Sequence, residues 1–371
     1  MKLRYKILNF FLLLVAAVVV AGMLVLSHTP SCDAAAATPL PAGATLMKGV
    51  IRRCYGSPET VVRYVDLAKP SPADDEVLVR VKAASVNPLD FHYVEGTPYL
   101  VRLDRGLGKP EDPRLGVDFA GTVEAVGKSV TRFKPGDEVF GGKLGALAQF
   151  VSVREARAIV LKPDNVSYEQ AAAVPIAAIT ALQALRDKGH VHAGQKVLIN
   201  GASGGVGSYA VQLAKSMGAE VTGVCSTRNV DLVRSLGADH VIDYTKEDFT
   251  QRPEHYDVIL DNVSTHSVLS YRRVLSPNGI YVMVGSTTTG HWFGWLETPL
   301  EAWLLSPFMS QKFSMFLADL NKEDLGVLAS LMQSGKMSSA IDRTYPLSEA
   351  AQALAYLEKG HARGKVVVTI D

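Results

Sequence analysis

Residues 196–208, with the sequence Lys-Val-Leu-Ile-Asn-Gly-Ala-Ser-Gly-Gly-Val-Gly-Ser, constrain the fold more strongly than any other stretch of the chain. A short apolar strand leads directly into a glycine-rich turn, and apolar residues at helical spacing follow. Small residues allow a tight turn, let backbone N–H groups approach a pyrophosphate and permit close helix-to-strand packing. Glycine clusters also occur in plain strand-to-helix turns, but the context on both sides favours a dinucleotide site. The predicted cofactor contacts in this turn are Gly201, Ala202, Ser203, Gly204, Gly205, Val206 and Gly207.

Strand-like runs alternate with helical segments between residues 191 and 286. The expected strands are 197–200, 221–225, 240–243, 257–260 and 280–284. This alternation predicts an α/β fold with a doubly wound parallel sheet. Residues 47–82 instead contain short runs in which apolar and polar side chains alternate, and they predict a separate small β domain.

The first 46 residues differ in character from the rest of the chain. Residues 7–26 carry no charge and include only Asn9 as a strongly polar side chain. This segment is long enough to cross a bilayer as a helix. A retained transmembrane anchor and a cleaved secretory signal both fit, with small residues at 34–37 available for cleavage, and the length favours the anchor. Residues 27–45 are rich in Ala, Pro and Ser and predict a flexible tether.

The membrane side of such an anchor stays open. Lys2, Arg4 and Lys6 precede the apolar segment. Basic residues there favour a cytoplasmic N-terminus and a protein body outside the membrane, yet reduced dinucleotide cofactors are scarce outside the cytoplasm. Translation from Met47 would give a cytoplasmic protein, and cleavage would give an exported one.

Charge and cysteine content exclude several classes of function. The 38 Lys and Arg residues balance 37 Asp and Glu residues, and no basic stripe for nucleic acid remains beyond the N-terminus. The three cysteines, Cys32, Cys54 and Cys225, are not closely spaced. They predict neither a disulfide framework nor a metal cluster.

Several ordered motifs lie between Met47 and Asp371. They are Met47-Lys-Gly-Val, Tyr55-Gly-Ser-Pro-Glu59, Ser85-Val-Asn-Pro-Leu-Asp90, Gly116-Val-Asp-Phe-Ala-Gly121, Lys134-Pro-Gly-Asp-Glu-Val139, the glycine turn, and Gly360-His-Ala-Arg-Gly-Lys-Val-Val367. Together they resemble the zinc-free quinone oxidoreductase-like branch of the medium-chain dehydrogenase/reductase superfamily. The resemblance implies a Rossmann domain inserted in a GroES-like β-barrel catalytic domain. We expect an N-terminal segment over 1–46, the catalytic domain over 47–174 and 313–371, and the nucleotide-binding domain over 175–312.

Zinc-dependent members of this superfamily hold the metal through a cysteine in the first turn and a Gly-His-Glu motif on a later strand. The corresponding turn here, from Ser85 to Asp90, has no cysteine, and the later position reads Gly-Val-Asp and ends at Asp118. His92 and Asp118 are the nearby candidate ligands, whereas catalytic zinc usually takes about three protein ligands. The sequence therefore predicts no metal.

The strand over 220–225 ends without an acidic residue. An acid about 20 residues beyond the glycine turn selects NAD, whereas Arg accommodates the 2′-phosphate of NADP. Ser226, Thr227 and Arg228 follow the strand, so we predict NADP(H), although the same residues could be a helix cap and a surface charge. Further predicted cofactor contacts are Asn262, Gly285 and Lys365.

Without a metal, an α,β-unsaturated carbonyl compound or a quinone is the favoured substrate. Hydride adds to the conjugated system, and a hydrogen-bond donor suffices to hold the charge that develops on oxygen. We predict Asn87, Tyr93 and Thr180 as donors, and the resemblance implies that Thr180 lies beside the nicotinamide. Asn87 could instead serve only to stabilise the Asn-Pro turn.

All three tryptophans, Trp292, Trp295 and Trp303, lie within residues 290–305. Such a cluster forms a core, a subunit contact or a cleft, and the resemblance implies that the substrate cleft and a homodimer edge lie here. An apolar substrate would suit both this region and a membrane anchor. Two other functions stay open: a zinc-free alcohol dehydrogenase or ketone reductase, and a non-enzymatic NADPH-binding protein tethered to a membrane.

Overall fold

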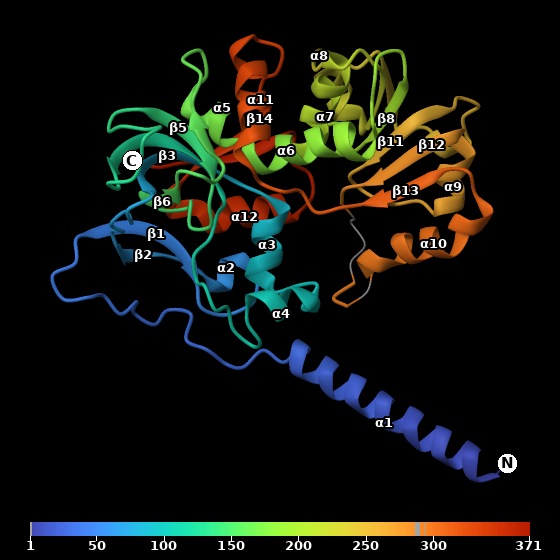
Figure 1. The fold of residues 1–371 in the computed structure, drawn as a ribbon, viewed down its shortest axis with the longest axis horizontal. Coiled ribbons are helices and arrows are strands. Elements are labelled where there is room, and N and C mark those ends of the chain that lie inside the picture. The colour runs from blue at the N-terminus through green and yellow to red at the C-terminus, as the bar shows by residue number, and fades with distance from the viewer. Residues whose placement is uncertain (1, 286–289, 293) are drawn as a thin grey trace.

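A computed structural model describes residues 2–285, 290–292 and 294–371, and it contains two domains that lie side by side (Figure 1). The nucleotide-binding domain is built on a parallel sheet with the strand order β10-β9-β8-β11-β12-β13. Its strands are β8 (Lys196–Asn200), β9 (Glu220–Cys225), β10 (His240–Asp243), β11 (Tyr256–Asp261), β12 (Leu275–Met283) and β13 (Lys312–Met315). The order reverses between β8 and β11, where doubly wound sheets bind their ligands. The predicted doubly wound sheet is confirmed, and the boundary expected at residue 312 falls inside β13.

Helices connect these strands and pack on the sheet. They are α7 (Gly205–Ser216), α8 (Val230–Ser235), α9 (Val268–Val274) and α10 (Glu297–Leu305). Helix α6 (Pro175–Gln183) lies between the two domains (Figure 1) and packs against α7. Ala177, Ala178 and Ala181 are buried on α6, and their small side chains allow this close approach.

The catalytic domain contains a sheet with the order β14-β15-β3-β4-β5-β7, to which β6 adds by pairing with β3. Its strands are β3 (Glu76–Val86), β4 (Asp118–Val126), β5 (Glu138–Gly142), β6 (Phe150–Arg154), β7 (Ile159–Leu161), β14 (Ile341–Pro346) and β15 (Lys365–Thr369), with β1 (Leu46–Arg52) and β2 (Val62–Ala68) as a separate pair. Its helices are α2 (Pro58–Val61), α3 (Pro88–Glu95), α4 (Arg102–Arg105), α5 (Tyr168–Ala172), α11 (Lys322–Gln333) and α12 (Ala350–Glu358). Because β15 pairs with β3, the end of the chain completes the domain that starts near residue 46.

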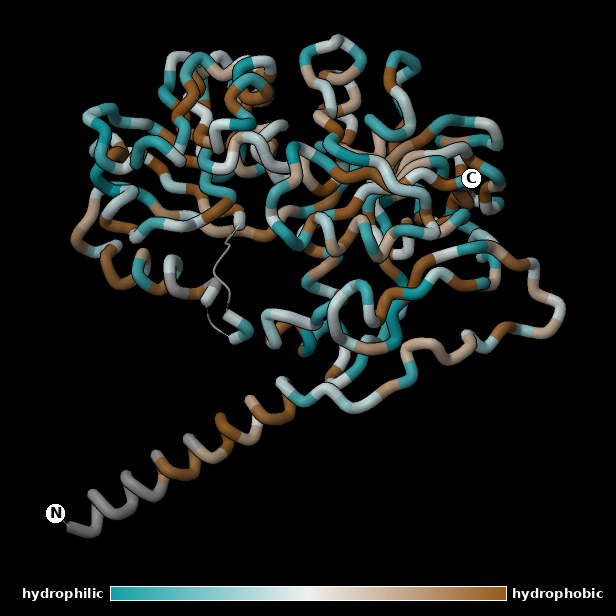
Figure 2. Tube along the Cα trace, turned by 180° about the vertical axis from the view of Figure 1, so that it is seen from behind, coloured by the Kyte–Doolittle hydropathy of each residue, from teal (hydrophilic) through white to brown (hydrophobic). Residues whose placement is uncertain are grey.

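Each domain has its own apolar core. Val77, Val79 and Val81 alternate along β3 and pack with Phe119 in the catalytic domain. A second core runs through the nucleotide-binding sheet and continues over α5 and α6 into the catalytic domain. Figure 2 shows hydrophobic stretches along the inner strands and hydrophilic ones in many of the outer turns. The continuous core holds the two domains together.

Helix α1 (Lys2–Ser27) projects from the body of the protein (Figure 1). No helix in the described part of the chain is long and apolar enough to cross a membrane.

The segment after α1 is attached to the catalytic domain rather than free. Cys32 and Cys54 form a disulfide across 22 residues, and Cys225 is free and buried. The buried Arg102 donates from Nη1 to the carbonyl oxygens of Leu26 and His28 and to the hydroxyl of Thr29. The cysteine spacing, which predicted no disulfide framework, did not reveal this single disulfide, because spacing along a chain does not show which distant segment it packs against. The flexible tether over residues 27–45 stays a prediction.

Candidate cofactor and active site

The glycine turn closes at the carboxyl end of β8. Gly201 has a φ of +74°, and a Cβ there would lie 2.7 Å from Cγ2 of Val263. A Cβ on Gly207 would collide with the carbonyl oxygen of Gly201. Gly204 is the N-cap of α7 and has no side chain to pair with the first N–H groups of that helix. The helix start is therefore available to a phosphate group.

Two buried acceptors beside the turn have no hydrogen-bond partner in the described structure. Asn262 donates from Nδ2 to the Asn200 carbonyl (2.8 Å) and leaves Oδ1 unpaired. Asn229 donates from Nδ2 to the hydroxyls of Ser203 (2.9 Å) and Ser226 (3.2 Å), and its Oδ1 is also unpaired. Unpaired buried acceptors cost free energy, so they suit a ligand with hydroxyl groups, such as a ribose. Asn229 was not predicted, although it directly follows the predicted residues.

The other predicted contacts around the turn have distinct places. Ala202 is buried in the core, and Val206 packs against that core. Gly285 follows β12, and a Cβ on it would lie 3.0 Å from the carbonyl oxygen of Asn262. The structure thus brings Asn262 and Gly285 together at the end of the sheet, whereas Ala202 supports the turn from beneath.

The side chains of 226–228, after β9, face different partners. Thr227 donates from Oγ1 to Oδ2 of Asp243 (2.6 Å), so its hydroxyl is turned toward β10. Hydrogen bonds from Thr227 and Thr245 hold the pKa of Asp243 below its usual range. Arg228 is exposed and donates from Nη2 to the carbonyl of His361 (2.5 Å). An acid therefore lies near the end of β9, but it comes from the neighbouring strand and is already bound by protein groups.

Asn87 is the N-cap of α3, and both ends of its side-chain amide are fixed. Nδ2 donates to Oδ2 of Asp118 (2.9 Å), and Oδ1 accepts from Nζ of Lys365 (2.5 Å). The backbone N–H of Asn87 donates to Oδ2 of Asp90 (2.8 Å). Ser85 adds a hydrogen bond from Oγ to Asp118 (3.0 Å). We call these five residues, Ser85, Asn87, Asp90, Asp118 and Lys365, the buried polar cluster.

Two carboxyl groups share one ammonium group in the buried polar cluster. Asp90, Asp118 and Lys365 are exposed by 1%, 0% and 3%. Burial raises the pKa of Asp118, raises the pKa of Asp90 to about 7, and lowers the pKa of Lys365. The Asp118–Lys365 attraction opposes the shifts of both partners. Oδ1 of Asp90 has no hydrogen-bond partner, so a neutral Asp90 balances the charge of the cluster.

Strand β15 brings the buried polar cluster to the glycine turn. The backbone N–H of Gly364 donates to the carbonyl of Ser203 (2.8 Å). A Cβ on Gly205 would lie 3.3 Å from Cδ of Lys365. The stem of Lys365 therefore lies beside the turn, as expected for a cofactor contact, while its ammonium group binds Asn87 and lies 3.6 Å from Asp118.

The other two predicted donors differ in what they can still donate. The Tyr93 hydroxyl oxygen accepts from Nη2 of Arg105 (2.6 Å), so its hydrogen stays available to a ligand. Thr180 donates from Oγ1 to the carbonyl of Ile176 (2.7 Å) and offers only acceptor positions in this arrangement. The N–H of Ile176 donates to Oδ1 of Asp118 (3.1 Å), which links the helix of Thr180 to the buried polar cluster.

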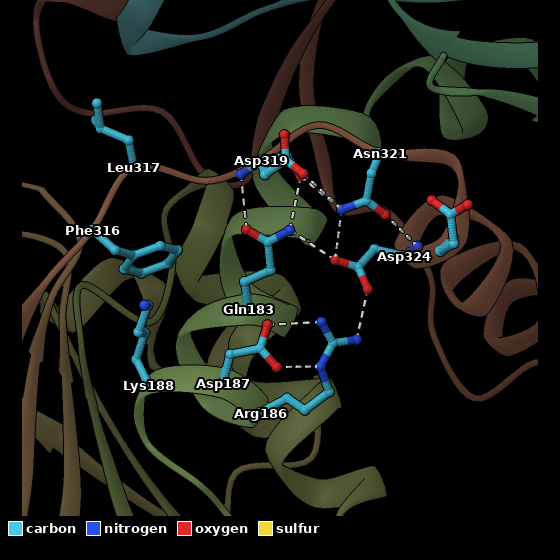
Figure 3. Close-up of a pocket in the computed structure, with 10 residues that line it drawn as sticks. Gln183, Arg186, Asp187, Lys188, Phe316, Leu317, Asp319, Asn321 and Asp324 are labelled. Carbon is cyan, nitrogen blue, oxygen red and sulfur yellow. Dashed lines mark hydrogen bonds and ion pairs between the residues drawn. The ribbon is translucent and has the colours of Figure 1, made fainter. Parts of the chain in front are cut away.

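A second polar cluster lies at the far end of α6 and lines a hollow of about 520 Å³ (Figure 3). Gln183 donates from Nε2 to the Asp319 carbonyl (2.8 Å) and to Oδ2 of Asp324 (2.7 Å). Arg186 pairs with both Asp187 (2.6 Å) and Asp324 (2.6 Å). We call Gln183, Arg186, Asp187, Asp319 and Asp324 the surface polar cluster. The charges of Arg186, Asp187 and Asp324 are paired with one another, which indicates a structural role.

Part of the tryptophan region, residues 286–289 and 293 and the side chain of Trp295, lies outside the described structure. Trp303 on α10 is 71% exposed. The backbone N–H of Tyr99 donates to the His291 carbonyl (2.7 Å), and the Tyr99 ring contacts the rings of His291 and Trp292. The segment after α3 therefore contacts the segment after β12, across the two domains.

Comparisons with known proteins identify the family. Residues 73–164 match the alcohol dehydrogenase GroES-like domain, and residues 236–368 match the family described as zinc-binding dehydrogenase. A trans-enoyl reductase from Aspergillus terreus is 36% identical over 325 residues, covering 80% of this chain and 87% of that protein. A chloroplastic quinone-oxidoreductase from Triphysaria versicolor is 34% identical, covering 87% and 98%. The solved quinone oxidoreductase from Coxiella burnetii has a TM-score of 0.76 at 31% identity, covering 88% and 100%.

The chain belongs to the zinc-free quinone oxidoreductase-like branch of the medium-chain dehydrogenase/reductase superfamily. It is an oxidoreductase with the GroES-like and Rossmann domains of that superfamily, and its cofactor is a nicotinamide dinucleotide.

The donor set of this quinone oxidoreductase-like protein does not fit a zinc ion. The Asp118 carboxylate accepts hydrogen bonds from Ser85, Asn87 and Ile176 and faces the Lys365 ammonium group at 3.6 Å. A buried ammonium beside this carboxylate takes the place that a divalent cation would need. Among the residues that the structure describes, no three His, Cys, Asp or Glu side chains are grouped as metal ligands.

Proposed function

We propose that this protein is an NADPH-dependent, zinc-independent reductase that transfers hydride to an α,β-unsaturated carbonyl compound or a quinone. One observation carries the proposal: β15 joins the glycine turn to the buried polar cluster, through Gly364 and Ser203 at 2.8 Å and through Lys365 beside Gly205. The nucleotide turn therefore lies beside the buried polar cluster, which contains the candidate donor Asn87. The names of the Aspergillus and Triphysaria relatives, an enoyl reductase and a quinone oxidoreductase, support the substrate class.

The residues of this chain have separable tasks in the proposed reaction. The bound cofactor supplies the hydride. The N–H groups at the start of α7 bind its pyrophosphate, and the unpaired acceptors of Asn229 and Asn262 receive its hydroxyl groups. Tyr93 donates a hydrogen bond to the substrate oxygen, and Arg105 strengthens that donor by binding the phenol oxygen. A conjugated substrate needs no stronger electrophile, because its charge is delocalised.

NADPH rather than NADH is proposed from the residues after β9. An acid near that strand end, Asp243, already accepts from Thr227 and Thr245 and pairs with Lys246. Arg228 is exposed and bonds a carbonyl oxygen of His361, which leaves most of its N–H groups for a 2′-phosphate. This arrangement favours a phosphate over a ribose hydroxyl as the group recognised there.

The decisive experiment is NADPH oxidation with an enone, a quinone and a simple aldehyde, each with and without a chelator. Turnover with the enone or the quinone, unchanged by the chelator, is the expected result. Oxidation of simple alcohols with NADP as the dominant activity would support a zinc-free alcohol dehydrogenase instead. NADPH binding without turnover on the whole panel would support a non-enzymatic NADPH-binding protein.

A second experiment tests the proposed side-chain donors. Tyr93→Phe is expected to lower kcat with an enone by about tenfold or more, since a lost hydrogen bond to a developing charge costs about 1.5–3 kcal/mol. Asn87→Ala is expected to lower kcat by a similar factor, because Asp118 and Lys365 each lose a buried hydrogen bond. Tyr64→Phe is the matched control, because Tyr64 is an exposed tyrosine on β2. Full turnover in both Asn87→Ala and Tyr93→Phe would remove these two assignments.

A further inference from the structure

Asp118 connects four elements where the two domains meet. Oδ2 accepts from Ser85 on β3 (3.0 Å) and from Asn87 at the start of α3 (2.9 Å). Oδ1 accepts from the N–H of Ile176 at the start of α6 (3.1 Å). Nζ of Lys365 on β15 lies 3.6 Å away. Because Asp118 is fully buried, no solvent can replace a lost partner.

Each segment that Asp118 holds carries a residue placed at the candidate site. Helix α3 starts at Asn87, α6 carries Thr180, and β15 places the Lys365 stem beside the glycine turn. The Asp118 carboxylate can accept from its three donors and face the ammonium group at the same time only when these segments hold one relative position. The position of each segment is therefore coupled to the others through a single side chain.

We propose that Asp118 is a positioning residue for hydride transfer, which holds Asn87, α6 and Lys365 in the arrangement that the reaction requires. This inference rests on the proposed function and assigns a role to a residue that touches neither the cofactor turn nor the candidate donor Tyr93 by any described hydrogen bond. Loss of Asp118 lowers kcat more than it raises the KM for NADPH, because the glycine turn itself keeps its geometry.

The charges around Lys365 predict a change in the pH dependence of kcat, which a simple loss of stability would not produce. Asp118 faces Lys365 from β4 and Asp90 acts on it from α3, while Asp118 also acts on the buried Tyr209 from α7. Without the Asp118 charge, the pKa of Lys365 falls because its counter-ion is lost. The pKa of Asp90 falls as well, because a like charge is lost. Both changes move the basic limb of the kcat profile to lower pH.

The test uses the full chain with the variants Asp118→Asn and Ser85→Ala and the matched control Asp324→Asn in the surface polar cluster. Wild type is assayed first with NADPH and an enone. Asp118→Asn is expected to lower kcat by about tenfold or more, to change the KM for NADPH by less than about threefold, and to shift the basic limb to lower pH. Ser85→Ala, which removes one donor and keeps the charge, is expected to lower kcat about threefold without a shift of the limb.

The outcomes separate the two proposals. A wild type that turns over no enone or quinone contradicts the proposed function. An active wild type with Asp118→Asn and Asp324→Asn equally active contradicts the positioning role. Loss of activity in Asp118→Asn with an unchanged pH profile contradicts that role as well. If Asp118→Asn does not fold, Ser85→Ala decides the matter, since a folded Ser85→Ala protein with wild-type kcat contradicts the role.

Discussion

The buried and surface polar clusters share a motif of two carboxyl groups around one cation, but their carboxyl pKa values shift in opposite directions overall. Each places two carboxyl groups around one cation: Asp90 and Asp118 around Lys365, and Asp187 and Asp324 around Arg186. In the surface polar cluster the Arg186 side chain is 42% exposed, and although burial opposes it, hydrogen bonds from Arg186 and Gln183 hold the pKa of Asp324 below its usual value. In the buried cluster, burial raises the pKa of Asp90 to about 7.

The contrast shows that burial, rather than the count of charges, decides what an ion cluster does. Water around the half-exposed Arg186 screens part of the negative charge, and the hydrogen bonds to Asp324 keep the pKa of that carboxyl group low. No water reaches Lys365, so the buried polar cluster responds to its excess carboxyl group by keeping a proton. Perturbed carboxyl groups of this kind are typical of functional sites.

The largest effect is expected for Lys365→Met. The substitution leaves two buried carboxyl groups without a cation, and breaking a buried pair in this way costs about 3–5 kcal/mol. Urea unfolding at pH 7 measures the free energy of unfolding. The loss should shrink at pH 5, where Asp118 more readily takes a proton. A decrease in the free energy of unfolding of less than about 1 kcal/mol would show that the Lys365 charge contributes no more than an exposed ion pair.

The pH dependence of stability comes next and is carried by Asp90. Its folded pKa of about 7 lies above the usual aspartate value of 3.8, so its favourable contribution is fully present below the lower value and is lost as the pH rises through 7. Asp90→Asn keeps an oxygen for the Asn87 N–H and removes this titration. Relative to wild type, the variant should gain up to about 4 kcal/mol between pH 4 and pH 8 in urea unfolding. Parallel stability curves for the two proteins would contradict the raised pKa.

A smaller effect is expected for Arg228→Ala. Arg186 is paired with two carboxylates, whereas Arg228 bonds one carbonyl oxygen, so the charge of Arg228 is the one better placed to receive a phosphate. The KM for NADPH should rise about tenfold, while that for NADH changes less than about twofold. Steady-state kinetics with both cofactors measure this. Equal losses for the two cofactors would remove the NADPH assignment.

The smallest effect is expected for Arg186→Met in the surface polar cluster. Asp187 keeps access to water, and the buried Asp324 keeps its hydrogen bonds from Gln183 and Asn321, so the free energy of unfolding should fall by about 1 kcal/mol or less. The kcat with an enone should stay at the wild-type value. A loss of activity here, measured beside Lys365→Met, would place the surface polar cluster in the reaction and erase the distinction between the two.

Sequence reasoning succeeded where the signal is local and failed where it depends on distant packing. The five predicted strands of the nucleotide-binding sheet and the glycine turn follow from short patterns, and all are present. Asn87 was predicted as a donor, but its contacts with Asp118 and Lys365 join residues from three separate strands and turns. The acid near the end of β9, Asp243, belongs to the next strand and cannot be read from the β9 motif. The disulfide of Cys32 depends in the same way on where its segment packs.

The disulfide between Cys32 and Cys54 also changes what removal of the N-terminal helix would require. A protease that cuts after the small residues at 34–37 opens the backbone, yet residues 1–32 stay linked through sulfur to the catalytic domain. Release then needs two separate events, hydrolysis of a peptide bond and reduction by a thiol. A cleaved sample would keep its full mass on a non-reducing gel and lose the N-terminal segment only after a reductant is added. Gels run with and without reductant would therefore report both whether the chain has been cut and whether the disulfide is intact.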